Sequence, residues 1–145
     1  MIRSMYMKLQ QEQKDQRLKR GLSILRKEGV AFAYLFGSQA QGRTILSSDV
    51  DIATYIGKGT PRARFAARLR LIRNLSKAFG VPADVTMLDD VRSVAFRFTV
   101  IKEGYPIVVR DEGKRLDFEL KTMREYEEFA PFLRLYNTQY LAHAI

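Results

Sequence analysis

The sequence predicts an α+β fold in which a few short strands pack with longer helices in a two-layer arrangement. Short apolar segments bounded by glycine or proline indicate the strands, and the segments between them repeat their apolar residues at helical spacing. The length of 145 residues and the hydrophobic fraction of 46% suit one globular domain with its own core. We find no repeat and no low-complexity linker, so we expect a single folded unit.

The first helix and the strands are predicted from local residue patterns. The chain up to Gly29 is expected to be helical, because leucines recur at helical spacing before that glycine. The nearly all-apolar run Val30–Phe36 is typical of a buried strand, and Gly37 begins a tight turn after it. Further strands are expected at residues 49–56, 85–88 and 106–109, the last at a sheet edge because it contains Pro106.

The segment from Pro61 to Phe79 is predicted to be an amphipathic helix. Thr60 supplies a capping hydroxyl, and Gly80 supplies a C-terminal stop. Arg64 and Arg68 project toward the apolar side, where their stems can lie along the surface. The expected core-facing residues are Phe65, Leu69, Ile72, Leu75 and Phe79, and the expected basic face carries Arg62, Arg70, Arg73 and Lys77.

The C-terminal third is predicted to be mostly helical. Asp90 is placed as the cap of a helix that ends before Gly104, and Asp89 as a turn residue. From Asp111 onward the composition is helical, with a break at Pro131. We therefore expect an N-terminal helix over residues 1–29, a core over 30–110 and C-terminal helices over 111–145.

The composition excludes several classes of site. The chain has no Cys and a single His, so a disulfide framework and a Cys-ligated metal are excluded, and any metal must be held by oxygen. No apolar run approaches the ~20 residues of a membrane helix, and the N-terminus does not resemble a secretory signal, so we expect a cytoplasmic protein. With 25 Lys and Arg against 16 Asp and Glu, the net charge of +9 favours polyanionic partners.

Three aspartates are predicted to meet near one end of the sheet. Asp49 and Asp51 lie two residues apart in a predicted strand, so their side chains point to the same face, and Asp84 leads into the next strand. Such like charges are stable when divalent cations neutralise them, and Mg²⁺ favours carboxylate and phosphate oxygens. Two such ions about 4 Å apart can activate an attacking hydroxyl and stabilise a leaving pyrophosphate. The pattern therefore indicates nucleotidyl transfer.

Gly37 and Ser38 fit the same chemistry. A residue without Cβ permits a sharp turn after a strand and lets backbone N–H groups approach phosphate closely, and Ser38 would add a hydroxyl. A DxD pair alone is usually a solvated strand end, and a Gly-Ser pair alone is a weaker signal still. Their joint spacing after an apolar strand, with a third Asp before another strand, is more specific and favours a metal site.

The segments GSQAQG, SSDVDIA and DVT together resemble the signature of the nucleotidyltransferase superfamily, which is GS, a ten-residue spacer, DxD and a third Asp. The chain is similar to the minimal nucleotidyltransferases of the DNA polymerase beta-like superfamily, and specifically to MntA-type antitoxins of HEPN/MNT toxin–antitoxin modules. The resemblance runs roughly from Val30 to Glu112 and includes DVTMLDD and VAFRFTVIKEGYPIVVRDE.

This resemblance implies a palm with a mixed β-sheet and helices packed on it, ATP and two Mg²⁺ ions as cofactors, and transfer of AMP to a tyrosine of a HEPN toxin. The catalytic and metal-binding carboxylates that it implies are Asp49, Asp51 and Asp84. The expected nucleotide-binding residues are Gly37, Ser38, Arg43 and Ser48. Arg43 is included because Gln41 stands where many members carry an arginine, for which Arg43 could compensate.

Three functions are open on the sequence alone. The first is an antitoxin enzyme that adenylylates a HEPN partner, the second a nucleotidyltransferase directed at RNA or a small molecule, and the third a non-catalytic ATP-binding antitoxin that acts by complex formation. The chain is too short for the separate domains with which larger polymerases hold an acceptor, so we expect a partner to complete the acceptor site. His143 is expected to be incidental, and the basic face of helix 61–79 is either solvated or a surface for a partner or nucleic acid.

Overall fold

The computed structural model describes residues 2–37 and 49–141. Its helices are α1 (Ile2–Lys27), α2 (Pro61–Phe79), α3 (Val94–Glu103) and α4 (Glu112–Tyr136). Its strands are β1 (Phe32–Phe36), β2 (Val50–Tyr55), β3 (Ala83–Met87) and β4 (Tyr105–Val109). The 3₁₀ turn η2 spans Leu88–Asp90, and the π-helical turn η3 spans Asn137–Leu141.

The strands form a mixed sheet in the order β3-β2-β1-β4. β1 pairs antiparallel with both β2 and β4, whereas β2 and β3 run parallel and are joined through α2. The prediction of an α+β fold with a mixed sheet flanked by helices is confirmed. Pro106 lies in the edge strand β4, as expected from its missing N–H.

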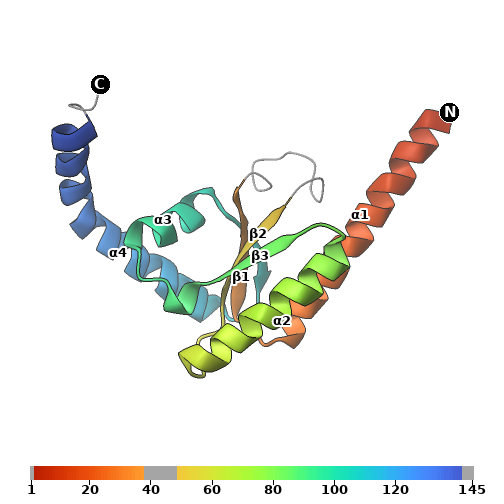
Figure 1. Cartoon of the computed structure of the whole chain (residues 1–145), viewed down its shortest axis with the longest axis horizontal. Coiled ribbons are helices and arrows are strands. Elements are labelled where there is room, and N and C mark those ends of the chain that lie inside the picture. The colour runs from red at the N-terminus through yellow and green to blue at the C-terminus, as the bar shows by residue number, and fades with distance from the viewer. Residues whose placement is uncertain (1, 38–48, 142–145) are drawn as a thin grey trace.

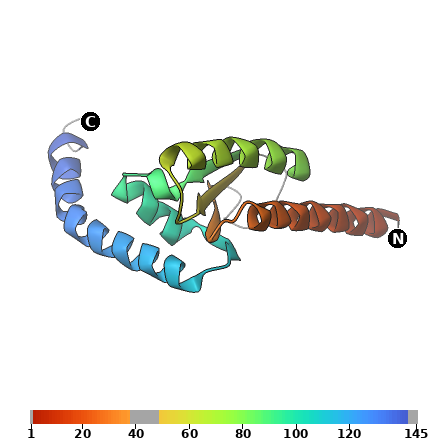
Figure 2. The ribbon, with the colours of Figure 1, turned by 90° about the horizontal axis from the view of Figure 1, so that it is seen from below.

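Helices lie against both faces of this sheet (Figure 1, Figure 2). Alternation along β1 decides which side chains face which layer, because successive residues of a strand point to opposite faces. Ala33 and Leu35 belong to the core formed with α1 and α2. Phe32 and Tyr34 belong to a second core formed with α3, which Phe118 of α4 borders. Among the described residues, no helix is long and apolar enough to cross a membrane.

A close helix contact holds α1 against α2. Gly21 lies on α1 where the ring of Phe79 packs from the end of α2, and a Cβ on Gly21 would overlap that ring. Phe79 is fully buried, so its ring has no solvent to move into. Glycine at this position therefore allows the two helices to approach more closely than a side chain would permit.

Gly21→Ala is expected to destabilise the fold although alanine has the higher helix propensity. The propensity gain of about 1 kcal/mol is smaller than the cost of overpacking a buried ring, which runs to about 3 kcal/mol. We expect a lower melting temperature by circular dichroism. Gly113→Ala in α4 is the matched control, because a Cβ there meets no atom closer than 3.4 Å. A Gly21→Ala protein as stable as the wild type would contradict this packing.

The buried face of α2 differs from the predicted one. Phe65 and Leu69 are 56% and 50% exposed, so the prediction that they face the core is wrong. The buried positions recur every fourth residue instead, because this stripe faces both α1 and the sheet. These positions are Ala67, Leu71, Leu75 and Phe79.

Two predictions at helix ends are corrected. Asp90 does not cap α3. The chain makes the turn η2 first, and the Ser93 hydroxyl accepts from the Phe96 N–H at the helix start. Pro131 does not break the C-terminal helix, since α4 runs through it to Tyr136. The helix instead changes direction along its length (Figure 1, Figure 2), as expected where proline removes one backbone hydrogen bond.

Candidate active site

The candidate site lies at the end of the sheet where β1 ends and β2 and β3 begin. Asp51 is the register partner of Phe36 on β1 and of Asp84 on β3. Because β2 and β3 are parallel neighbours, Asp51 and Asp84 stand side by side on one face of the sheet. Their neighbours Val50 and Val85 point to the opposite face, into the core under α1 and α2. The strands therefore position the two carboxylates directly.

Electrostatics confirm that Asp51 is crowded by negative charge. Burial is the largest cause of the raised pKa of the Asp51 carboxyl, and the carboxylates of Asp84 and Asp49 raise this pKa further. Asp49 directly precedes β2, two residues before Asp51. The ionised state of Asp51 is thus disfavoured by its surroundings, and a cation placed near it would relieve this repulsion.

Gly37 leaves the space that Asp51 uses. It follows β1 with a φ of +76°, a left-handed conformation that side chains rarely adopt. A Cβ built on Gly37 would lie 2.6 Å from Oδ2 of Asp51. Glycine is therefore favoured at this position for two reasons: its left-handed backbone conformation and the space that it leaves for the Asp51 carboxylate.

Asp84 is more exposed than Asp51, with its side chain 64% exposed. Its Oδ1 accepts from the Val85 N–H at 2.9 Å and lies 3.4 Å from Nη2 of Arg68. Arg68 also donates from Nε to the Val85 carbonyl at 2.6 Å, which fixes the guanidinium along the edge strand. The sequence pattern predicts Arg68 only on the apolar side of its helix and does not indicate its contact with the third aspartate.

The carboxylates of Asp49, Asp51 and Asp84 suit a metal ion that binds together with a substrate. Within residues 2–37 and 49–141, no three acidic or imidazole side chains converge into a ready-made metal cage. Mg²⁺ is usually held by one or two carboxylates together with substrate phosphates and water rather than by an all-protein cage. Asp51, with its disfavoured charge and the carboxylates of Asp49 and Asp84 nearby, fits that mode.

Three predicted nucleotide-binding residues, Ser38, Arg43 and Ser48, lie outside the described residues, as do Gln41 and His143. Two other acids have structural partners: Asp89, which is predicted as a turn residue, and Asp90, which is predicted as a helix cap. Asp89 accepts from the N–H groups of Ile56 and Gly57 at 3.0 and 2.7 Å. Asp90 pairs with Arg64 at 2.7 Å, and this hydrogen bond lowers the pKa of the Asp90 carboxyl.

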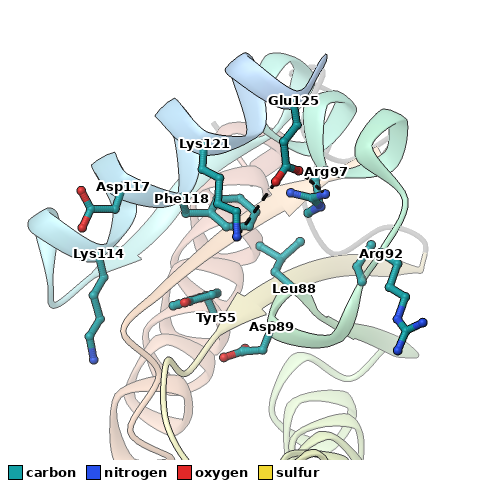
Figure 3. Close-up of a pocket in the computed structure, with 11 residues that line it drawn as sticks. Tyr55, Leu88, Asp89, Arg92, Arg97, Lys114, Asp117, Phe118, Lys121 and Glu125 are labelled. Atoms are coloured by element: carbon teal, nitrogen blue, oxygen red, sulfur yellow. Dashed lines mark hydrogen bonds and ion pairs between the residues drawn. The ribbon is translucent and has the colours of Figure 1, made fainter. Parts of the chain in front are cut away.

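A cavity of about 470 Å³ is lined by residues of β2, η2, α3 and α4 (Figure 3). Tyr55 on its wall lies four residues along β2 from Asp51, which is about 13 Å at the rise of a strand. Charged side chains that line this cavity pair with one another: Glu125 forms ion pairs with Arg97 at 2.6 Å and with Lys121 at 4.0 Å. We therefore assign the carboxylate end, and not this cavity, as the candidate active site.

The raised pKa of Asp51 predicts a pH-dependent stability in the absence of metal. The folded state holds the Asp51 proton more tightly than the unfolded state, so stability falls as pH rises through the folded pKa and stays lower above it. Asp51→Asn removes this titration. The melting temperature of the variant minus that of the wild type, both in a chelator, should increase from acidic to neutral pH. A difference that stays constant or decreases would contradict the crowding of Asp51.

Comparisons with known proteins bear on the family and the fold of the chain. The family model described as polymerase beta, nucleotidyltransferase matches residues 6–113. No curated protein sequence matches the chain. Solved structures with the same fold include chains of three toxin–antitoxin complexes, each less than 25% identical to this chain.

The first of these is a toxin–antitoxin complex with AMP-PNP, with 23% identity, a TM-score of 0.68, and coverage of 83% of this chain and 96% of that one. The second is a tri-AMPylated Shewanella oneidensis HEPN toxin with an MNT antitoxin, with 20% identity, a TM-score of 0.66, and coverage of 86% and 97%. The third is an MntA–HepT complex, with 21% identity, a TM-score of 0.64, and coverage of 84% and 95%.

Proposed function

The chain belongs to the polymerase beta nucleotidyltransferase family, and from that premise we propose that it transfers AMP from ATP to a tyrosine of a HEPN toxin. The observation that carries the enzymatic part is the side-by-side register of Asp51 and Asp84, with Gly37 against the Asp51 carboxylate. The acceptor is proposed by likeness to the solved complexes, of which one holds AMP-PNP and another an AMPylated HEPN toxin.

In this proposal Asp49 and Asp51 hold the metal ions and Asp84 faces the acceptor. When bound, Mg²⁺ would offset the charge of the aspartates and of the triphosphate. The Asp51 carboxylate is kept on the catalytic face by its place in β2 and by the space beside Gly37. The side chain of Asp84 is the exposed one of the register pair, so it is reachable by a group that approaches from outside the chain.

The proposed reaction forms a bond between the tyrosine oxygen and the α-phosphorus of ATP. The bond from that phosphorus to the oxygen of the β-phosphate breaks, and pyrophosphate leaves with its electron pair. Asp84 accepts the proton of the tyrosine hydroxyl, and Arg68 holds that carboxylate at the start of β3 through its contact at 3.4 Å. The partner supplies the acceptor, so the chain alone is expected to bind ATP but to transfer poorly to small alcohols.

Mass spectrometry of the partner tests the proposal. A HEPN protein whose gene neighbours the gene of this chain is incubated with this chain, ATP and Mg²⁺. Its mass should increase in increments of AMP, located on a tyrosine. The double variant Asp49→Asn plus Asp51→Asn should produce no increment. AMP found instead on added RNA or on a small molecule would favour the second function considered above.

The same variant separates catalysis from complex formation. A non-catalytic antitoxin would still neutralise its partner after both aspartates are changed to asparagine. Under the proposed function, the double variant binds the partner but no longer silences it. Neutralisation that persists in the double variant, without any AMP on the partner, would overturn the proposal.

A further inference from the structure

A second charged surface lies on the side of the sheet away from the carboxylates. A groove of about 500 Å³ runs between α1 and α2, which lie side by side (Figure 1, Figure 2). Both helices pack on the face opposite to Asp51. We call this surface the α1–α2 basic groove, and it is lined by Arg20, Ser23, Ile24, Lys27, Asn74, Lys77 and Ala78. Its lining contains three cations and no acid.

The close approach of the helices brings these cations together. Because Gly21 lets Phe79 pack against α1, the flanks of the two helices face each other across the groove. Arg17 extends the groove at one end, with its guanidinium 3.5 Å from the position of a Cβ on Gly80. Arg73 lies one helical turn before Lys77 and extends it along α2. From Arg17 to Lys27 the basic residues cover about 15 Å of α1.

Within the part of the chain that the structure describes, these cations differ from three arginines of α2 that are paired with acids. Arg64, Arg68 and Arg70 each pair with an acid, namely Asp90, Asp84 and Glu28. Arg70, which is expected on the basic face from the sequence, is neutralised by its ion pair with Glu28 at 2.5 Å. Among the described residues, none of the groove cations makes an ion pair or a side-chain hydrogen bond; these are Arg17, Arg20, Lys27, Arg73 and Lys77.

We propose that the α1–α2 basic groove binds the phosphodiester backbone of a nucleic acid strand. Unpaired lysines and arginines on flexible stems suit phosphates, which lie in a row and need no fixed geometry. A protein partner would be anchored by aromatic or large apolar side chains in a desolvated pocket. This groove has no aromatic residue, and its apolar lining is limited to Ile24 and Ala78. Binding is therefore electrostatic and independent of base sequence.

The proposal is tested by fluorescence anisotropy of the full chain with labelled oligo(U) RNA and, in a parallel arm, single-stranded oligo(dT) DNA. The triple variant Arg20→Gln, Lys27→Gln, Lys77→Gln removes the three lining cations. We expect it to weaken binding at least about tenfold at low salt, and to reduce the slope of log affinity against log salt by about 2, at ~0.7 per lost phosphate contact. Equal effects in both arms indicate recognition of the shared backbone, and effects with RNA alone indicate an additional 2′-hydroxyl contact.

The control removes the same charge elsewhere. Lys102→Gln, Lys114→Gln, Arg124→Gln lowers the net charge from +9 to +6, as the groove variant does, but on α3 and α4. It should retain most of the affinity and the salt slope. Equal losses in the two triple variants, or no binding of either oligonucleotide by the wild type, would overturn the proposal, as would preferential binding of polyglutamate. Asp51→Asn should bind the strand normally, which keeps this test separate from that of the proposed transfer reaction.

Discussion

Asp51→Asn is expected to lower the rate of AMP transfer by on the order of 10³-fold or more, since it removes a charged ligand from the reacting centre. The substitution keeps the shape of the side chain and its place in β2 opposite Asp84. It removes only the negative charge with which the metal would be held. The rate is measured as AMP incorporated into the HEPN partner at saturating ATP.

The fold of this variant should be intact or more stable. Burial and two neighbouring carboxylates disfavour the charge of Asp51, so asparagine relieves a cost that the metal-free wild type carries. Asp117→Asn is the matched control, because it makes the same change on an exposed position of α4. It should leave the rate within about twofold of the wild type. A catalytically active Asp51→Asn would mean that the carboxylate pair is not the reacting centre.

Gly37→Ala is expected to cost on the order of 10²-fold in transfer rate, because small displacements of a catalytic group have effects of that size. The new methyl carbon would lie 2.6 Å from Oδ2 of Asp51, so the carboxylate must move. The left-handed φ of +76° adds a backbone penalty of about 1 kcal/mol. Both the rate and the melting temperature should fall.

Gly59→Ala separates these two effects. Gly59 has a similar φ of +81°, and a Cβ there meets nothing closer than 3.9 Å. It therefore carries the same backbone penalty with no contact to a carboxylate. We expect Gly59→Ala to lower the melting temperature about as much as Gly37→Ala and to leave the transfer rate unchanged. Equal rates in the two variants would show that the space beside Asp51 is unimportant.

The sequence predicted the sheet well because its signals are local. The apolar run before Gly37 indicated β1, and the proline of β4 indicated an edge strand. The two-residue spacing of Asp49 and Asp51 predicted a shared face, since the period of a strand is two. The exact neighbour of Asp51, which is Asp84, depends on the register of two strands separated by α2 and could not be derived from spacing alone.

The sequence predictions that were wrong or incomplete concern residues whose partners are distant in the sequence. Asp90 matches a helix cap by composition, but it pairs with Arg64, 26 residues away, and leaves the cap to Ser93. Arg70 belongs to a basic stripe on a helical wheel, yet it forms an ion pair with Glu28, which directly follows α1. Arg68 reaches Asp84 around the edge of β3, and no periodicity within α2 contains that information. Local sequence patterns predict helices and strands, whereas contacts between distant residues determine which charged side chains are paired.

Manganese binding measured by electron paramagnetic resonance tests the central claim most directly, because Mn²⁺ can replace Mg²⁺ at oxygen ligands and its free form gives the signal. With a non-hydrolysable ATP analogue present, and after subtraction of binding by the analogue alone, the account predicts that the wild-type chain binds two Mn²⁺ ions. The variant Asp49→Asn plus Asp51→Asn should bind neither with comparable affinity. Unchanged Mn²⁺ binding in that double variant would contradict the assignment of these carboxylates as the metal site.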